Sequence, residues 1–257
     1  MKIIKPIIAL MLVTVTAAAL LLSSCGQGGD GAEALTVIYE GFEKETSQFT
    51  PKEGGDPIEF RTYVWILENT SDQEISKAEV AVIALDENGE ELKTDDGTSP
   101  RFSKIPLPDL EPGDRAWVKT LEVDWETAPT SYTLEFSGGK TGSFTGEPMT
   151  ITDSYTIRKD WAHADYGLTI RNDGQNDFTW LIDWSDVSGD TGRQFYIVAA
   201  DRDADGNIVY AENLTPLDIE TMEMLVENVT IAAGEEMDVA AIGGGDIEDP
   251  EFMLCWY

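Results

Sequence analysis

The order of strand and turn signals in this chain occurs twice, and this repetition restricts the possible folds more than any other feature. A strand-like run that ends at Glu68-Asn69-Thr70-Ser71 is matched by one that ends at Arg171-Asn172-Asp173-Gly174. The turn Leu110-Glu111-Pro112-Gly113-Asp114 is matched by Ile231-Ala232-Ala233-Gly234-Glu235. The offset is 103 residues for the first pair and 121 for the second. A duplicated unit whose loops have drifted in length gives this pattern.

Both copies are made of short strand-like runs. Aromatic and β-branched residues fill these runs, and clusters of Asp, Asn, Gly and Pro separate them. Several short strands with regular turn signals predict a sandwich or barrel. Only Leu217 to Val229 is ambiguous between helix and strand. We therefore expect an all-β protein with two tandem β-sandwich domains, residues 35–147 and 148–257.

Residues 1–24 have the features of a secretory signal peptide. Lys2 and Lys5 precede an uncharged run, residues 6–22, which is short for a membrane-spanning helix. The run ends in Leu22-Ser23-Ser24-Cys25-Gly26, which resembles the lipobox of bacterial lipoproteins. The resemblance implies that Cys25 receives a diacylglycerol and becomes the first residue of the mature chain. The alternative is an ordinary secretory signal with a chance cysteine.

A lipid on Cys25 predicts where the protein resides. Two or three acyl chains, such as palmitate, hold a protein stably at a membrane, whereas a single chain is marginal. Residues 25–34 begin with a glycine-rich, polar segment that has the composition of a flexible tether. We expect the folded part to be lipid-anchored on the extracytoplasmic face of the cell membrane.

The first copy resembles the FxLYD-type immunoglobulin-like domains of Gram-positive surface lipoproteins. The resemblance rests on a strand that ends at Asn69, a strand that closes on Leu85-Asp86 ahead of Gly89, and the Pro112-Gly113 turn. It covers most of residues 35–125 and, less closely, 149–242. Val82 stands where the family name has Phe, and Ala84-Leu85 stands where it has Leu-Tyr. The resemblance implies two immunoglobulin-like sandwiches and no particular activity.

The mature chain is strongly acidic. Without Lys2 and Lys5 it has 15 Lys and Arg against 49 Asp and Glu, a net charge of −34. Such a chain is a poor ligand for nucleic acid, because each phosphate contact needs a cation. Anionic lipid headgroups would also repel it. The charge favours divalent cations or basic partners, or it is simply a solvated acidic surface.

One segment matches the calcium-loop pattern D-x-D-x-D-G-x5-E in full. Its candidate oxygen ligands, by the chemistry of such loops, are Asp201, Asp203, Asp205, Asn207 and Glu212. The flanking runs are strand-like rather than helical, and the matching segment of the first copy is Asp86-Glu87-Asn88-Gly89. A strand pair joined by Asn-Gly or Asp-Gly is a strong hairpin signal. A hairpin turn is therefore the favoured interpretation, with a calcium site in a β-loop as the alternative.

The motifs of the common hydrolases are absent, so we expect no catalytic residues. The chain contains no G-x-S-x-G before a helix and no H-E-x-x-H. The single histidine, His163, and the second cysteine, Cys255, are too few for a zinc site. With Cys25 acylated no intrachain disulfide is possible, and the apolar surroundings of Cys255 predict a buried thiol.

Aromatic residues provide the remaining candidates for ligand binding. Phe178, Trp180, Ile182 and Trp184 fall on one face of a strand, where large aromatics are mostly core residues. The same face, if exposed, could stack on sugar rings or on a partner. Trp161 lies in an expected loop and is the better exposed candidate.

The expected function is a non-catalytic binding or adhesion module with a protein or glycan ligand. An alternative is a structural or accessory component of a cell-envelope complex that binds no free ligand. A carbohydrate-active hydrolase is a third, more distant possibility, because 49 acidic residues make many chance carboxylate pairs.

Overall fold

The computed structural model describes residues 31–49, 58–92, 102–120, 129–142, 148–159, 163–182, 193–244 and 247–257. Within these ranges the chain is all strand and turn, apart from the three-residue 3-10 helix η1 (Ala32–Ala34). The all-β expectation is confirmed, and the strands form several sheets, as in a β-sandwich. Among the described residues, no helix has the length and apolar character needed to cross a membrane.

Fourteen strands make up this part of the chain. The first half contains β1 (Leu35–Phe49), β2 (Ile58–Asn69), β3 (Glu74–Leu85), β4 (Phe102–Pro106), β5 (Arg115–Lys119) and β6 (Ser131–Gly142). The second half contains β7 (Met149–Lys159), β8 (His163–Asn172), β9 (Phe178–Trp180), β10 (Phe195–Arg202), β11 (Ile208–Leu217), β12 (Val229–Ile231), β13 (Glu236–Gly244) and β14 (Glu251–Trp256).

The two halves repeat one strand order. In the first half, antiparallel pairing gives β1-β2-β5 on one side and β4-β3-β6 on the other. In the second half, it gives β7-β8-β13 and β11-β10-β14, while β9 and β12 form a separate pair. Strands in equivalent positions pair in equivalent ways, as a duplication predicts.

A buried asparagine closes the second strand of the first half. Asn69 has no exposed surface, and its Nδ2 donates to the carbonyls of Gln73 at 2.8 Å and Leu110 at 3.0 Å. Its Oδ1 accepts the N–H of Ser71 at 3.0 Å, and its own carbonyl accepts the N–H of Gly113 at 2.8 Å. Gly113 has a φ of 85°, a backbone conformation that favours glycine. One side chain thus fixes two neighbouring turns.

Asn172 makes the same contacts in the second half. It is also fully buried, and its Nδ2 donates to the carbonyls of Asn176 at 2.9 Å and Ile231 at 3.0 Å. Its Oδ1 accepts the N–H of Gly174, and its carbonyl accepts the N–H of Gly234, both at 2.9 Å. The matched sequence signals therefore correspond to matched hydrogen bonds.

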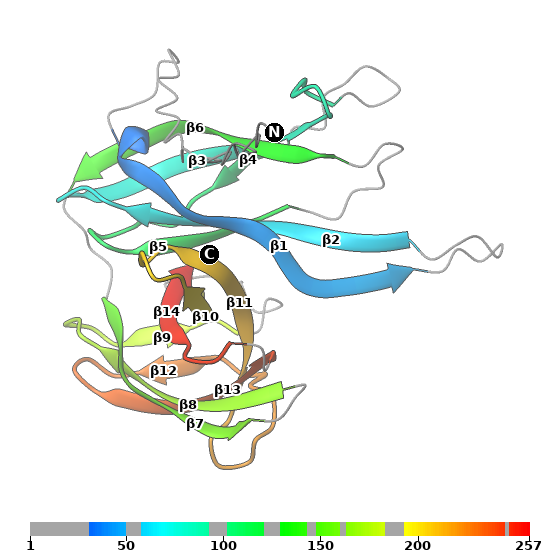
Figure 1. Ribbon diagram of the computed structural model, residues 1–257. Helices are drawn as coiled ribbons and strands as arrows, with labels where there is room; N and C mark the ends of the chain where they lie inside the picture. Colours follow the sequence, from blue (N-terminus) through cyan, green and yellow to red (C-terminus); the bar gives the residue numbers. More distant parts are fainter. Residues whose placement is uncertain are drawn as a thin grey trace, which may run out of the picture.

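The halves are joined through one continuous sheet rather than standing as independent sheets. β14 pairs in parallel with β5 at Cys255–Arg115 and Trp256–Ala116, and β11 pairs with β13. The resulting nine-stranded order is β1-β2-β5-β14-β10-β11-β13-β8-β7. Figure 1 shows β14, β10 and β11 between the strands of the first half, above, and those of the second half, below. The boundary expected at residues 147 and 148 thus separates two copies of a topology but does not separate two sheets.

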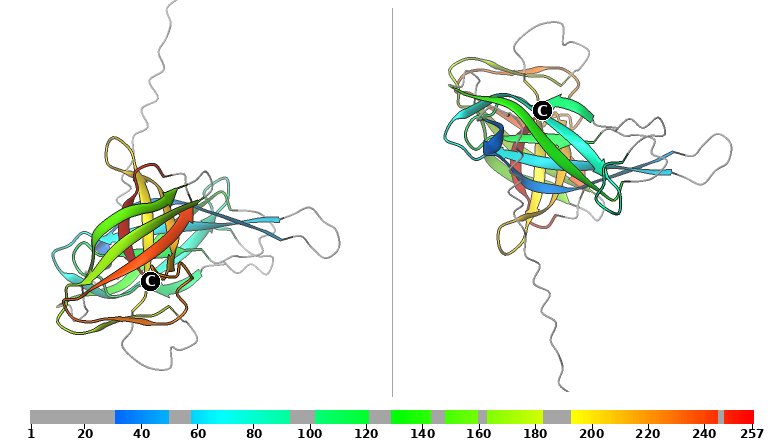
Figure 2. Two further views of the ribbon diagram at one scale, coloured as in Figure 1. Left: turned by 90° about the horizontal axis from the view of Figure 1, so that it is seen from below. Right: turned by 90° about the horizontal axis from the view of Figure 1, so that it is seen from above.

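The shared sheet curls on itself at the junction. β1 contacts β11, although four strands lie between them in the sheet order, and the backbone of Ala211 forms a hydrogen bond with Tyr39. In Figure 2 the yellow strands of the second half cross the blue and cyan strands of the first. A buried apolar cluster fills the concave side of this curl, with residues from β1, β2, β5, β10, β11 and β14. Its members are Tyr39, Val64, Ile66, Trp117, Val198, Ala200, Ile208, Ala211, Met253 and Cys255.

A second and larger core lies on the other side of this sheet and also spans both halves. Its aromatic centre stacks Trp180 on Phe195 at 4.4 Å, with Trp256 edge-on to Phe195 at 5.5 Å. Phe178 and Trp180 are 3% and 2% exposed, so the prediction that they are core residues is confirmed. Ile182 is half-buried. Trp161 and Trp184 lie outside the described residues.

Candidate functional site

The segment that matches a calcium loop is the hairpin turn between β10 and β11. The N–H of Asp203 donates to the carbonyl of Asn207 at 2.9 Å, and Gly206 donates back to Asp203 at 3.0 Å. The Asp203 Oδ1 accepts the N–H groups of Asp205 at 2.9 Å and Asn207 at 2.8 Å. The Asn207 side-chain amide also donates to the Asp203 carboxylate, at 3.1 Å. This bond, more than the backbone bonds, lowers the pKa of Asp203. The Asp203 carboxylate therefore organises the turn itself.

The first copy builds the same turn after β3. The Asp86 Oδ1 accepts the N–H groups of Asn88 and Glu90, both at 2.8 Å, and Gly89 donates to the Asp86 carbonyl at 3.0 Å. The Glu90 N–H and the other donors lower the pKa of Asp86. A hairpin at this position is thus a property of the duplicated unit, as the sequence favours.

The other residues of the calcium pattern lie along the hairpin. Asp201 pairs with Tyr210 across the strands, and Glu212 pairs with Ala199 and accepts the Tyr210 hydroxyl at 3.0 Å. In the described part of the chain, no three His, Cys, Asp or Glu side chains form a group that could hold a metal ion. The structure does not gather Asp201, Asp203, Asp205, Asn207 and Glu212 into one site.

His163 and the two cysteines, which the sequence offers as the remaining reactive side chains, lie in different parts of the chain. Cys255 is fully buried, and burial raises the pKa of its thiol to about 12, so it stays protonated near neutral pH. His163 begins β8, opposite Gly244 of β13. Cys25 lies outside the described residues, so its lipidation stays a prediction.

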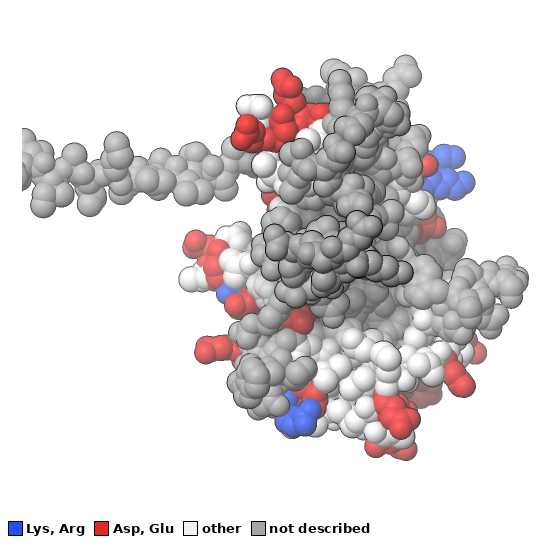
Figure 3. Space-filling view, turned by 90° about the vertical axis from the view of Figure 1, so that its right-hand side faces the viewer, with Lys and Arg blue, Asp and Glu red and all other residues white. Residues whose placement is uncertain are grey.

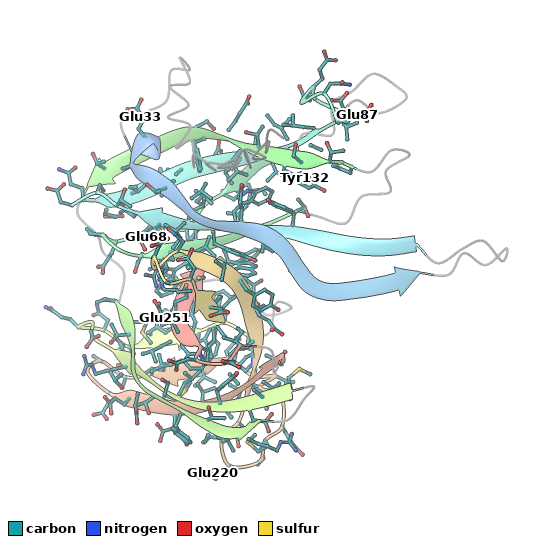
Figure 4. The ribbon with its side chains drawn as sticks, viewed as in Figure 1. Glu33, Glu68, Glu87, Tyr132, Glu220 and Glu251 are labelled. Atoms are coloured by element: carbon teal, nitrogen blue, oxygen red, sulfur yellow. The ribbon has the colours of Figure 1, made fainter. Side chains whose placement is uncertain are left out.

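Two ion pairs lie beside the junction between the halves, one within each half. Arg115 of β5 bonds Glu68 of β2 at 3.0 Å, and Arg202 of β10 bonds Glu251 of β14 at 3.1 Å. Arg115 also lowers the pKa of Glu251, though less than Arg202 does. Figure 4 shows Glu68 and Glu251 facing this junction from the two halves. Each pair links two strands of one half, and the electrostatic effect of Arg115 on Glu251 acts between the halves, where β5 pairs with β14.

Arg193 holds the other side of the junction. Its guanidinium lies 3.9 Å above the Trp256 ring, and its Nη2 donates to the Asp109 carbonyl of the first half. Asp114 accepts the N–H of Glu111 at 3.0 Å and a hydrogen bond from the Trp256 side chain. Burial nevertheless raises the pKa of Asp114. These contacts attach the turn after β4 to the second half. Arg193, Asp114 and Trp256 therefore hold the two halves together.

A cavity of about 270 Å³ opens in the second half beside β9, β10 and β11. Its walls are mainly apolar and aromatic and consist of Trp180, Leu181, Ile182, Gln194, Phe195, Tyr196, Ile197, Asn213, Leu214, Thr215, Pro216, Met224 and Leu225. Mostly apolar cavities with a few polar groups are the usual sites for ligands, although 270 Å³ lies just below their common size range.

Residues 218–228, the distal loop, form one rim of this cavity through Met224 and Leu225. The Asp218 Oδ1 accepts the N–H of Thr221 at 2.8 Å and of Glu220 at 3.1 Å, and the Asp218 N–H donates to the Glu223 carbonyl at 2.8 Å. The Thr221 donors lower the pKa of Asp218. Leu225 donates to the Pro216 carbonyl at 3.1 Å. The loop therefore has a defined conformation, although its sequence is ambiguous between helix and strand.

Most side chains of residues 220–227 are exposed, and three of them are large and apolar. Met224 is 61% exposed, Val226 is 64% exposed and Met222 is 38% exposed, whereas Leu225 is half-buried against the cavity. The alternation of Met222, Met224 and Val226 was visible in the sequence as a strand-like signal. The sequence did not show that these side chains are exposed, because an extended apolar segment is equally common in a core.

The distal loop and the start of the folded body lie at opposite ends of the molecule. Figure 4 labels Glu33 at the top, beside the point where the described chain begins, and Glu220 at the bottom, in the distal loop. Acidic side chains predominate on the face shown in Figure 3, over both halves. A tether at residue 31 would thus leave the distal loop on the far side of the body.

No family model, no curated protein and no solved structure matches this chain.

Proposed function

We propose that the chain is a non-catalytic lipoprotein, anchored through an acylated Cys25 on the extracytoplasmic face of a membrane. Two immunoglobulin-like repeats hold a binding surface away from that membrane. The observation that carries the proposal is the order of Lys2 and Lys5, an uncharged run and Leu22-Ser23-Ser24-Cys25. The glycine-rich, polar sequence of residues 26–31 has the composition of a flexible spacer after the cysteine.

The repeated topology supports the immunoglobulin-like assignment. The strand triplets β1-β2-β5 and β4-β3-β6 of the first half recur in the second half as β7-β8-β13 and β11-β10-β14, which β11 and β13 join within the nine-stranded sheet. Buried apolar side chains pack between the strands of both halves. A strand that ends at a buried Asn and a turn that ends in Gly recur at the positions on which the FxLYD resemblance rests. Sandwiches of this architecture present loops at their ends, and such loops commonly carry binding residues.

The second candidate is an accessory protein of a cell-envelope complex. The acidic surface is compatible with it, and the large aromatics at the junction, Trp65, Trp117 and Trp256, are buried rather than exposed for a ligand. The exposed apolar side chains of the distal loop favour a binding protein, because a purely structural surface does not require them.

The experiment is mass spectrometry of the mature protein after expression of the full chain in a bacterium. We expect an N-terminal peptide that begins at Cys25 and carries the mass of a diacylglyceryl group, together with recovery in the membrane fraction. The C25A variant should lose both the lipid and the membrane association, whereas C255A should keep them. A mature N-terminus at any other residue, without lipid, would refute the anchor.

A further inference from the structure

We infer that the distal loop is a docking surface for a polypeptide segment whose apolar side chains are flanked by Lys or Arg. The inference rests on the proposed binding function and names the class of partner. Met222, Met224 and Val226 would contact the apolar side chains of that segment, and Glu220, Glu223 and Glu227 would pair with its cations.

The exposed apolar side chains belong to a loop whose backbone conformation is already fixed. Hydrogen bonds to Asp218 and the Leu225–Pro216 bond fix the loop, so its exposed side chains need little ordering when a partner binds. Met222 has a φ of 59°, a conformation that costs free energy for any residue except glycine. Two of the three exposed side chains are methionines, which adapt their shape to varied apolar partners.

The acidic residues around these side chains favour a partner with positive charge. The distal loop contains Asp218, Glu220, Glu223 and Glu227 and no Lys or Arg. The three glutamates are exposed. Acidic groups around an apolar patch attract a basic partner over a distance and repel acidic ones.

The same charges argue against two other occupants. A second copy of the chain would bring another body of net charge −34 against this loop. An anionic lipid surface would repel the glutamates, and the proposed anchor at Cys25 would place the membrane at the other end of the body, because Glu33 lies opposite Glu220 in Figure 4. A basic, amphipathic segment of another protein satisfies both the charge and the position.

The test uses residues 26–257, which lack the signal and the lipid but contain every described residue. The probe is a fluorescent octapeptide of alternating lysine and leucine, followed by anisotropy. We expect saturable binding that weakens with salt, and much weaker binding of the lysine–serine and glutamate–leucine peptides. Because lipid is absent, a failure of the Cys25 anchor cannot alter this result.

Two variants locate the site. M222S/M224S/V226S should weaken binding of the lysine–leucine peptide at least about tenfold. The matched control Y155S/V209S changes side chains that are 52% and 54% exposed elsewhere, and it should leave binding unchanged. Should the triple variant unfold by circular dichroism, M224S alone serves, with a smaller expected loss.

Three results would overturn the inference. They are equal affinity of the triple variant, equal binding of the lysine–serine peptide, and no binding of the lysine–leucine peptide. Co-sedimentation of the protein with vesicles of phosphatidylglycerol, lost in M222S/M224S/V226S, would assign the loop to lipid instead.

Discussion

Asn69 and Asn172 are the residues that most clearly define the repeated unit. Each amide is buried, donates to two backbone carbonyls and accepts a backbone N–H. A buried polar group that loses its partner costs about 1 to 3 kcal/mol, because water cannot replace the missing hydrogen bond. The position of each Asn at a strand end was readable from the sequence, but its partners 41 and 59 residues away were not.

Replacing either asparagine should destabilise the protein markedly. N69A and N172A each leave two carbonyls and one N–H without the side chain, so we expect a loss of about 2 to 4 kcal/mol in the free energy of unfolding. Urea denaturation measures it, with the exposed-site variant T230A as the control. A loss below about 0.5 kcal/mol, the size of ordinary surface changes, would show that the amides are not structural.

The hairpin-turn carboxylates give a prediction about acid. The pKa values of Asp86 and Asp203 lie below the ordinary value, because turn N–H groups and neighbouring amides bind the charged form. For a lowered pKa, the contribution to stability is complete above the unfolded-state pKa and is lost as pH falls through the folded-state pKa. Both turns should therefore loosen only in strong acid.

NMR titration of the side-chain carboxyl carbons checks this expectation. Both aspartates should titrate below 3.8, the ordinary value for this group. In D86N/D203N the amide oxygen still accepts the turn N–H groups but no longer titrates, so acid destabilisation in this pH range should be reduced. Titration at or above 3.8 would mean that the turns are not held by these side chains.

At the scale of elements, the distal loop shows where sequence patterns reach their limit. Met, Leu and Glu favour a helix, while the alternation of Met222, Met224 and Val226 favours a strand. The hydrogen bonds of Asp218 and the bridge between Leu217 and Met224 fix the loop in a conformation that is neither helix nor strand. A local sequence pattern does not show either contact. By contrast, the β10–β11 hairpin was predictable, because its Asp-Gly turn is a local signal.

A glycine at position 222 should be tolerated. The side chain of Met222 is 38% exposed, so M222G loses little burial and removes the strain of a φ of 59°. We expect the free energy of unfolding to stay the same or to rise by about 0.5 to 1 kcal/mol. M224G has no such strain to relieve and should be destabilising by comparison. A larger loss in M222G than in M224G would contradict the loop conformation.

The edge strand β7 is irregular in a way that hinders pairing with another chain. It ends the nine-stranded sheet, and its pairing with β8 is interrupted by register shifts between Ile151 and Asp153 and between Thr156 and Arg158. Bulges twist an edge strand and make it a poor template for another chain. The free edge is thus protected, which leaves the distal loop as the better-suited interaction surface of this half.

At the scale of the molecule, the duplication was predictable but the union of the two halves was not. Matched Asn, Gly and Asp signals identify the copies in the sequence. The parallel pairing of β5 with β14 involves only Arg115, Ala116, Cys255 and Trp256, residues with no local signature for each other. Two cores then span the junction, so the halves form one body, with Glu33 near one end and the distal loop at the other.

The most direct test of this arrangement measures how far each end of the body stands from the membrane. The full chain, purified with the lipid proposed for Cys25, is placed on neutral lipid vesicles with an energy acceptor in the outer leaflet, and a donor dye is attached in either E33C or M224C. The buried Cys255 should not react. We predict strong energy transfer from position 33 and weak transfer from position 224. Equal transfer from both positions, or stronger transfer from 224, would contradict a body anchored at one end that presents its distal loop at the other.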